Sequence, residues 1–173
     1  MKRNRRSYSI AALGAAVLAS VAVVGGAGAT AEQAPPDKNI VQTAAGAGQF
    51  KTLIALAKQA GLAGALSGPG KLTVFAPTDK AFAKVPKATL RKLQRNKAQL
   101  RSVLLYHVVK GNVKAAQVVK FRRVKTLNGE YVRIGVKGNR VYLNRTTRVT
   151  KADIGASNGT IHVIDGVLIP PAS

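Results

Sequence analysis

Two histidines, a serine and a small number of carboxylates are the side chains of this chain that could do chemistry. His162 lies three positions before Asp165 in the stretch NGTIHVIDGVLIPP, and His107 lies five positions after Ser102. A serine, a histidine and a carboxylate held together form the active site of many hydrolases. Histidines and carboxylates can also bind a metal ion. The elements that position these residues decide whether either chemistry is available.

The spacing argues against catalysis at both places. The apolar neighbours of His162 predict a strand, and side chains of a strand alternate, so His162 and Asp165 point to opposite faces. On the helix expected before residue 107, Ser102 and His107 point in directions about 140° apart. The sequence contains no G-x-S-x-G nucleophile elbow and no phosphate-binding loop. We therefore predict that the protein is not an enzyme, has no catalytic residues, and uses both histidines structurally.

Metal and cofactor sites are not expected either. The chain has no cysteine and only two histidines, too few for a zinc site. We predict no metal and no cofactor. Stability must come from buried apolar side chains, and a chain of 173 residues that is 46% hydrophobic can build one domain with a core.

The excess of basic residues is the strongest feature of the composition. The chain has 28 lysines and arginines against 6 acidic residues, a net charge of +22. Such a surface is expected to meet acidic polysaccharides, wall polymers or lipid headgroups. Aromatic residues make up only 5% of the chain, which disfavours nucleic acid. The predicted polyanion patch comprises Lys87, Arg91, Lys92, Arg95, Lys97, Arg101, Lys120, Arg122, Arg123 and Lys125.

The N-terminal residues are typical of an export signal. The cationic stretch MKRNRRSYS precedes the apolar run IAALGAAVLASVAVVGG and an A-x-A site at residues 27–29. We predict a signal peptide over 1–29, a linker over 30–38, a domain over 39–171, and a secreted, extracellular or periplasmic location. An uncleaved membrane anchor is the alternative, and the choice between Sec and twin-arginine export stays open. Cleavage would remove four basic residues and leave a charge of +18.

Helical periodicity dominates the first half of the predicted domain. Residues 39–68 are predicted to be helical, with Phe50, Leu53, Ile54 and Ala57 on one buried face. Residues 71–76 are predicted to form a buried strand. Two further helices are expected after this strand, with Thr78 and Asn96 as their N-caps. The helix that begins after Asn96 is expected to turn Leu100, Val103 and Leu104 inward.

Strand-like alternation replaces helical spacing beyond Gly111. Strands are expected over KFRRVK, EYVRIGV and RVYLN, with turns at Asn128-Gly129 and residues 137–139, and TIHVID and GVLI are expected to complete the sheet. Helices followed by strands predict an α+β fold. The sheet is expected to be antiparallel, because strand–helix–strand alternation is lacking.

Three stretches resemble the signature boxes and central motif of the fasciclin domain family, in the family's order. They are LTVFAPTDKAF (72–82), LLYHVV (104–109) and ASNGTIHVIDGVLIPP (156–171). The resemblance implies a fasciclin-like β-wedge of two sheets with a packed layer of helices, in an extracellular adhesion protein. It also implies that Tyr106-His107 and Asp153-Ile154, which match pairs credited with integrin binding in animal members, form an adhesion contact.

These observations leave two hypotheses from different classes. The first is a secreted, monomeric adhesion or matrix-type binding module that binds an anionic surface polymer or a cell-surface receptor. The second is a small-ligand carrier or weak enzyme with a pocket between helices and sheet near His107, which a closed apolar cavity would favour. A further option is that the charge serves solubility alone and that the partner is another protein.

Overall fold

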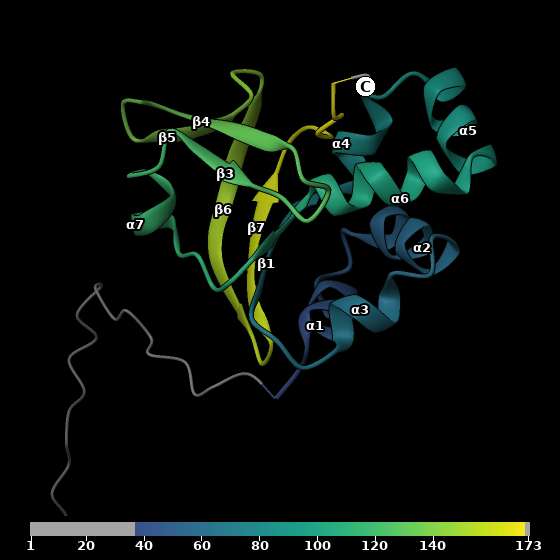
Figure 1. Ribbon diagram of the computed structural model, residues 1–173, viewed down its shortest axis with the longest axis horizontal. Helices are drawn as coiled ribbons and strands as arrows, with labels where there is room; N and C mark the ends of the chain where they lie inside the picture. Colours follow the sequence, from purple (N-terminus) through teal and green to yellow (C-terminus); the bar gives the residue numbers. More distant parts are fainter. Residues whose placement is uncertain (1–36, 172–173) are drawn as a thin grey trace, which may run out of the picture. The chain divides into compact units, whose positions relative to one another are not determined.

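The computed structural model of the chain describes residues 37–171. The predicted signal peptide (1–29) and almost all of the predicted linker (30–38) lie outside the described residues. The first half of the described chain is mostly helical and the second half mostly strand (Figure 1). In chain order the elements are α1 (Ile40–Ala47), α2 (Lys51–Gln59), α3 (Ala63–Ser67), β1 (Leu72–Pro77), α4 (Asp79–Ala83), α5 (Lys87–Arg95), α6 (Lys97–Tyr106), β2 (Val108–Lys110), α7 (Ala115–Val118), β3 (Arg123–Lys125), β4 (Tyr131–Lys137), β5 (Arg140–Leu143), β6 (Thr147–Ala156) and β7 (Gly159–Ile164).

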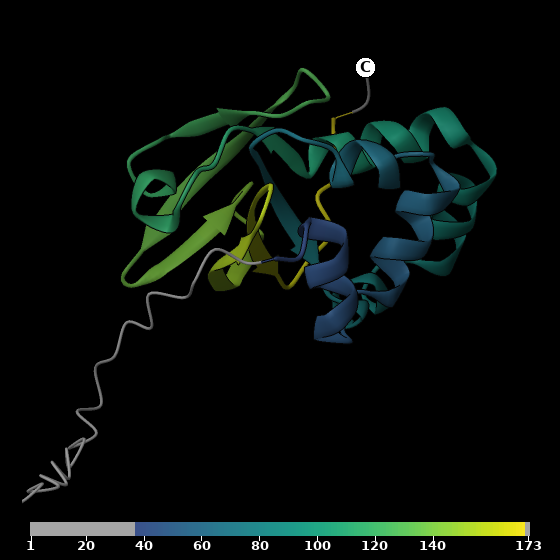
Figure 2. The same cartoon turned by 90° about the horizontal axis from the view of Figure 1, so that it is seen from below.

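One mixed sheet contains all of the described strands. Its order is β2-β1-β7-β6-β5-β4-β3. The two ends of this order approach each other, because Val109 bridges Thr126 and the N–H of Leu127 donates to the carbonyl of Val108 at 2.8 Å. The sheet is therefore nearly closed, and Figure 2 shows its strands curling round while α1–α6 lie to one side.

Two expectations about the sheet are wrong. The family resemblance implied two sheets, whereas a single nearly closed sheet is present. The pattern of elements predicted antiparallel pairing throughout, but β1 and β7 are parallel, in a register that runs from Leu72↔Gly159 to Pro77↔Ile164. These strands are distant in sequence, so the order of neighbouring elements contained no information about their pairing.

The strand predictions fail at one further place and omit two strands, β2 and β6. GVLI (166–169) is not a strand, because its buried Leu168 directs its N–H to the ring of His107 instead of to a neighbouring strand. The longest strand, β6, was not predicted at all. Its register shifts between Val149 and Ile154 interrupt the alternation by which a strand is recognised.

Most helix predictions are confirmed, with one division. The stretch 39–68 forms α1, α2 and α3, which are separated at Gly48 and Gly61, each with φ of 72°. Thr78 caps α4 by accepting from the N–H of Ala81. Asn96 caps α6 by accepting from the N–H of Gln99 at 3.1 Å. The hairpins at Asn128-Gly129 and at residues 137–140 are also present.

The core consists of two clusters on opposite faces of the central strands. Val74 and Ala76 belong to a cluster between the sheet and α1, α2 and α6. Phe75 belongs to a second cluster enclosed by the curved sheet, together with Tyr106, Val132 and other residues. A strand buried on both faces needs apolar side chains at nearly every position, which explains the composition of β1 and β7.

Candidate functional site

Asn158, in the turn between β6 and β7, joins elements that are far apart in sequence. Its Oδ1 accepts from the N–H of Ile40 at the start of α1 at 2.9 Å. Its Nδ2 donates to the carbonyls of Leu66 and Gly68 at the end of α3. The amide therefore fixes α1 and α3 to the sheet, and its role is structural.

His107 is completely buried at the C-terminal end of α6. Its Nδ1 lies 2.8 Å from the carbonyl of Val103, and its Nε2 accepts from the N–H of Leu168 at 2.9 Å. Because a carbonyl only accepts, the proton is on Nδ1 and the ring is neutral. Burial lowers the pKa of His107 to about 4, although the hydrogen bond to Val103 opposes that shift. The ring ties α6 to the C-terminal segment.

From the centre of β7, His162 holds in place the loop at Val113 and the irregular part of β6 at Asp153. Its Nε2 donates to the carbonyl of Val113 at 2.8 Å, and its Nδ1 accepts from the N–H of Asp153 at 3.3 Å. The ring also stacks on Phe75, with centroids 5.6 Å apart. Burial lowers the pKa of His162, while the hydrogen bond to Val113 and the charge of Asp153 oppose this. The carboxylate of Asp165 accepts from the N–H of Arg148 and not from His162, so His162 and Asp165 form no pair.

Three of the aspartates accept hydrogen bonds from the backbone. Asp79 accepts from the N–H groups of Lys51 and Thr52 at the start of α2, Asp153 from that of Ala115 at the start of α7, and Asp165 from that of Arg148. For Asp79, burial raises the pKa, but the hydrogen bonds from Thr52 and Lys51 outweigh it and leave the pKa below its usual value. Asp79 and Asp153 therefore stabilise helix starts, and Asp165 stabilises the beginning of β6.

The residues of the implied adhesion contact occupy different environments. Tyr106 and His107 are each 2% exposed, and the hydroxyl of Tyr106 donates to the carbonyl of Tyr131. Asp153 is exposed on β6, where a φ of 58° accompanies the register shift, and Ile154 is half-buried. The structure thus gives the two pairs separate partners, and only Asp153-Ile154 is accessible from outside.

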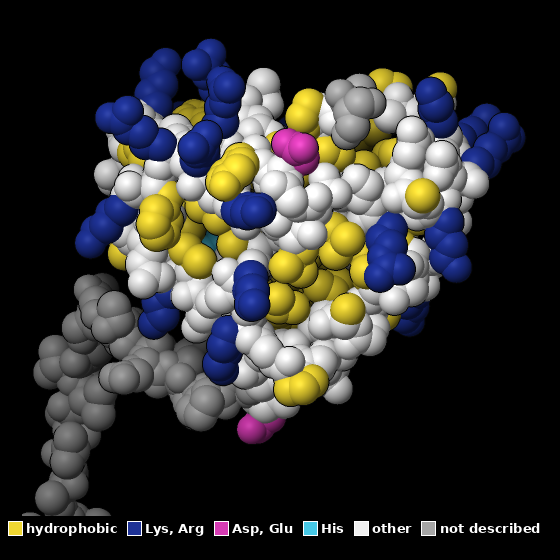
Figure 3. Space-filling view, in the orientation of Figure 1, with side chains coloured by type: hydrophobic (Ala, Val, Ile, Leu, Met, Phe, Trp, Pro, Cys, Tyr) yellow, Lys and Arg dark blue, Asp and Glu magenta, His cyan; other side chains and the backbone are white. Residues whose placement is uncertain are grey.

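The predicted basic patch divides into two groups on different elements. Lys87, Arg91, Lys92 and Arg95 lie on α5, and Lys97 and Arg101 lie on α6; all six are exposed. The other four cations lie between the end of α7 and the end of β3. Figure 3 shows dark-blue side chains over both regions of this face and few acidic ones.

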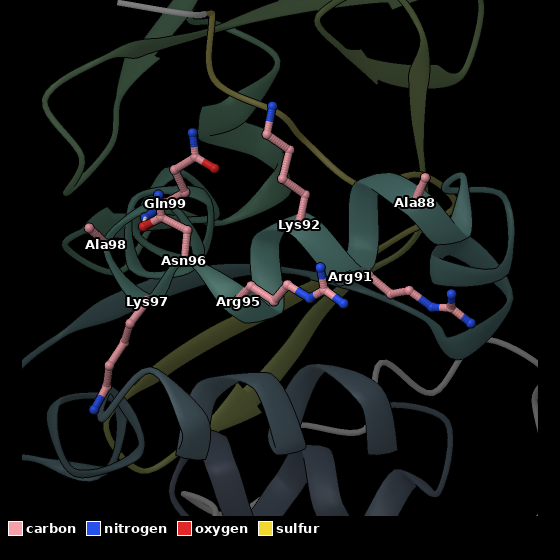
Figure 4. A pocket seen from close by; sticks show the side chains of 8 residues that line it. All are labelled: Ala88, Arg91, Lys92, Arg95, Asn96, Lys97, Ala98 and Gln99. Carbon is pink, nitrogen blue, oxygen red and sulfur yellow. Dashed lines mark hydrogen bonds between the residues drawn. The ribbon is translucent and has the colours of Figure 1, made fainter.

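A hollow of about 810 Å³ lies where α5 meets α6. Figure 4 shows Arg91 and Arg95 one turn apart on the same side of α5, while Lys97 extends from the start of α6. The lining contains no acidic residue: it is Ala88, Arg91, Lys92, Arg95, Asn96, Lys97, Ala98 and Gln99. An anionic group in this hollow would meet cations from two helices.

The space near His107 is small. An apolar gap there is lined by residues such as Leu53, Leu104, His107 and Ile161, and its volume is about 30 Å³. Ligand pockets measure about 300 Å³ or more, so this gap is far smaller than a ligand pocket. Within residues 37–171, no group of three His, Cys, Asp or Glu side chains is placed to hold a metal ion. In that same range, no helix is long and apolar enough to cross a membrane.

Known proteins share this arrangement of boxes and fold. The sequence model described as "Fasciclin domain" matches residues 48–170. The chain belongs to the fasciclin domain family. Fasciclin domains are adhesion and extracellular-matrix-type modules and are generally non-catalytic. The resemblance of the three signature stretches is therefore confirmed.

Individual relatives include bacterial and animal proteins. The chain is 47% identical over 147 residues to protein sll1483 of Synechocystis sp., which covers 83% of this chain and 81% of that protein. It is 35% identical over 139 residues to transforming growth factor-beta-induced protein ig-h3 of Sus scrofa, covering 80% of this chain but 20% of that protein. A solved FAS1 domain pair from the insect cell adhesion molecule fasciclin I has a TM-score of 0.65 at 19% identity, over 78% of this chain and 52% of that one, and so shows the fold.

Sequence reasoning missed what several residues of the fasciclin boxes do. By local pattern, Asn158-Gly159 is typical of a turn, and Asp79 is typical of an acidic residue in the first turn of a helix. In the structure, Asn158 binds α1 and α3, and Asp79 binds the start of α2. Asp79 immediately follows an N-cap threonine, but nothing local indicates that its partner is another helix.

Proposed function

We propose that this fasciclin domain is a secreted, non-catalytic adhesion module that binds anionic extracellular polymers through the cations of α5 and α6. The observation that supports this most directly is the hollow lined by Arg91, Lys92, Arg95 and Lys97, with no acidic side chain in its wall. Polymers with repeated sulfate, phosphate or carboxylate groups match such a surface.

The arrangement of the cations supports a polymer as the partner. Lys87, Arg91 and Arg95 are spaced four residues apart on α5, so each faces a like charge one turn away. Such pairs destabilise a helix by about 0.2–0.5 kcal/mol each. A polyanion would neutralise them together, and the binding would weaken steeply as salt rises.

Retention on immobilised heparin and on isolated wall polymer tests this proposal. The variant Arg91→Gln, Lys92→Gln, Arg95→Gln, Lys97→Gln should elute at much lower salt than the unchanged protein. The matched control, Lys58→Gln, Lys80→Gln, Lys137→Gln, Arg140→Gln, removes the same charge from exposed positions elsewhere. Equal losses in the two variants would mean that only net charge matters, and unchanged elution between about 50 and 200 mM salt would contradict electrostatic binding.

A further inference from the structure

A second hollow, of about 550 Å³, lies between β2, the end of α7 and β3. The valines that line it, Val109, Val113 and Val124, are buried or half-buried. Phe121 and Leu127 line it as well, yet they are 49% and 42% exposed. The lining of this hollow therefore includes large apolar side chains that are exposed to water. The hollow between α5 and α6 has no such side chains in its lining.

Cations surround these apolar side chains. Lys110, Arg123 and Lys125 line the same hollow, and Arg122 follows Phe121 directly. The guanidinium of Arg123 lies 4.7 Å from the ring centroid of Tyr131. Between residues 109 and 131 the only carboxylate is that of Glu130. Charge and apolar surface are thus combined within one short region.

The backbone holds this region in its exposed arrangement. The N–H of Leu127 donates to the carbonyl of Val108, and that of Phe121 donates to the carbonyl of Val118. Asp153 fixes the start of α7, and β3 pairs with β4 from Arg123↔Arg133 to Lys125↔Tyr131. Phe121 and Leu127 are therefore presented by ordered segments, and little entropy is lost when they are buried against a partner.

We propose that this surface binds an anionic lipid bilayer. It is called the sheet-edge surface, and consists of Lys110, Phe121, Arg122, Arg123, Lys125 and Leu127. The cations would lie among the lipid phosphates, while Phe121 and Leu127 enter the boundary between headgroups and acyl chains. A soluble polyanion would neutralise the cations but offer no apolar phase, and a zwitterionic bilayer would not attract them. The inference concerns a different surface from that of the proposed function and does not depend on it.

Tryptophan fluorescence can test the insertion directly, because the chain contains no tryptophan. Phe121→Trp places a reporter on the sheet-edge surface, and Gln94→Trp places a control on exposed α5. Both variants carry the same residues 1–36, so any binding by that segment is common to them. With vesicles of phosphatidylcholine and phosphatidylglycerol, the emission of Phe121→Trp should shift to shorter wavelength and be quenched by brominated lipid, while that of Gln94→Trp should not change.

Two further variants separate charge from apolar contact. Lys110→Gln, Arg123→Gln, Lys125→Gln should weaken vesicle affinity on the order of 100-fold. Phe121→Ser, Leu127→Ser should weaken it at least about tenfold, without changing retention on heparin.

The proposal is overturned if the tryptophan at position 121 stays in water on bound vesicles, or inserts equally into pure phosphatidylcholine. A stronger blue shift with an acidic, apolar peptide would also overturn it, and would assign the surface to a protein partner.

Discussion

The buried polar groups around Asn158 and His107 contrast with the exposed cations of α5 and α6. Inside, each group has a partner on a distant element. Among the described residues, Arg148 Nε is the only buried side-chain nitrogen or oxygen without a hydrogen bond. Outside, the hollow between α5 and α6 has cations from two helices and no carboxylate in its wall. The residues that stabilise the interior and those of the proposed binding surface are therefore different, so substitutions in the interior should change stability without changing retention on heparin.

The largest loss in the free energy of unfolding is expected for a substitution at Gly159. With φ of 158°, a Cβ added there would overlap the backbone carbonyl of Leu72 on the paired strand β1. We expect Gly159→Ala to lower the free energy of unfolding by at least about 4 kcal/mol, measured by chemical denaturation. Gly138→Ala is the control, since its φ is 59° but nothing lies within 4 Å of the added Cβ. It should cost only about 1–2 kcal/mol, and equal losses would contradict the steric explanation.

Asn158→Ala should have the next largest effect. It removes hydrogen bonds to Ile40, Leu66 and Gly68, and leaves one buried and two partly buried backbone groups without this partner. The expected loss in the free energy of unfolding is roughly 2–4 kcal/mol. The exposed turn residue Asn139 provides the control, and Asn139→Ala should change the free energy of unfolding by less than about 0.5 kcal/mol. If the folded fraction of Asn158→Ala bound heparin more weakly, the separation between interior and surface would be broken.

Acid should destabilise the interior through His107. The pKa of His107 is about 4 in the folded protein and about 6.5 in the unfolded chain, so between these values the unfolded chain binds more protons. The stability from the neutral ring is complete above about pH 6.5 and is lost as the pH falls towards 4, by roughly 3 kcal/mol. Asp79, whose pKa is lowered, adds a further loss only at lower pH.

Denaturation at several pH values and NMR titration of the imidazole check this prediction. His107 should stay neutral down to about pH 4, because a proton on Nε2 would face the N–H of Leu168. Protonation near pH 6.5 in the folded protein would contradict the burial argument.

The smallest effect on stability, and one of opposite sign, is expected on α5. Arg91→Glu replaces like-charge contacts with Lys87 and Arg95 by attractive ones, and should raise the free energy of unfolding by about 0.8–2 kcal/mol. The same variant should elute from heparin at lower salt. A variant that lost both stability and retention would show that Arg91 has a structural role after all. Arg101→Gln, on the exposed side of α6 and outside the hollow's lining, should change retention less.

Local signals predicted the elements well. Thr78 and Asn96 were identified as N-caps because a short polar side chain stood before a helical pattern, and both accept the expected hydrogen bonds. The alternation before Asn128-Gly129 and after it predicted a hairpin, which is present as β3 and β4. In each case the partner groups lie within a few residues, so the interaction is encoded in a short stretch.

Contacts between distant segments were not predictable in this way. Three features depend on which distant segments meet. They are the parallel pairing of β1 with β7, the strand β6 that was not predicted, and the near closure of the sheet between β2 and the loop after β3. The single basic patch expected from the sequence likewise became two surfaces, one whose only apolar lining residues are Ala88 and Ala98 and one built around Phe121 and Leu127.

The sequence by itself determined the family, the helix caps, the turns and the excess of positive charge, because composition and short-range hydrogen bonds need no knowledge of the fold. Only the tertiary structure decided that the histidines and aspartates serve as internal partners for backbone groups and that β1 pairs with β7. The physical reason is that burial and strand pairing bring together residues that are far apart in the chain, where spacing along the sequence no longer specifies distance in space.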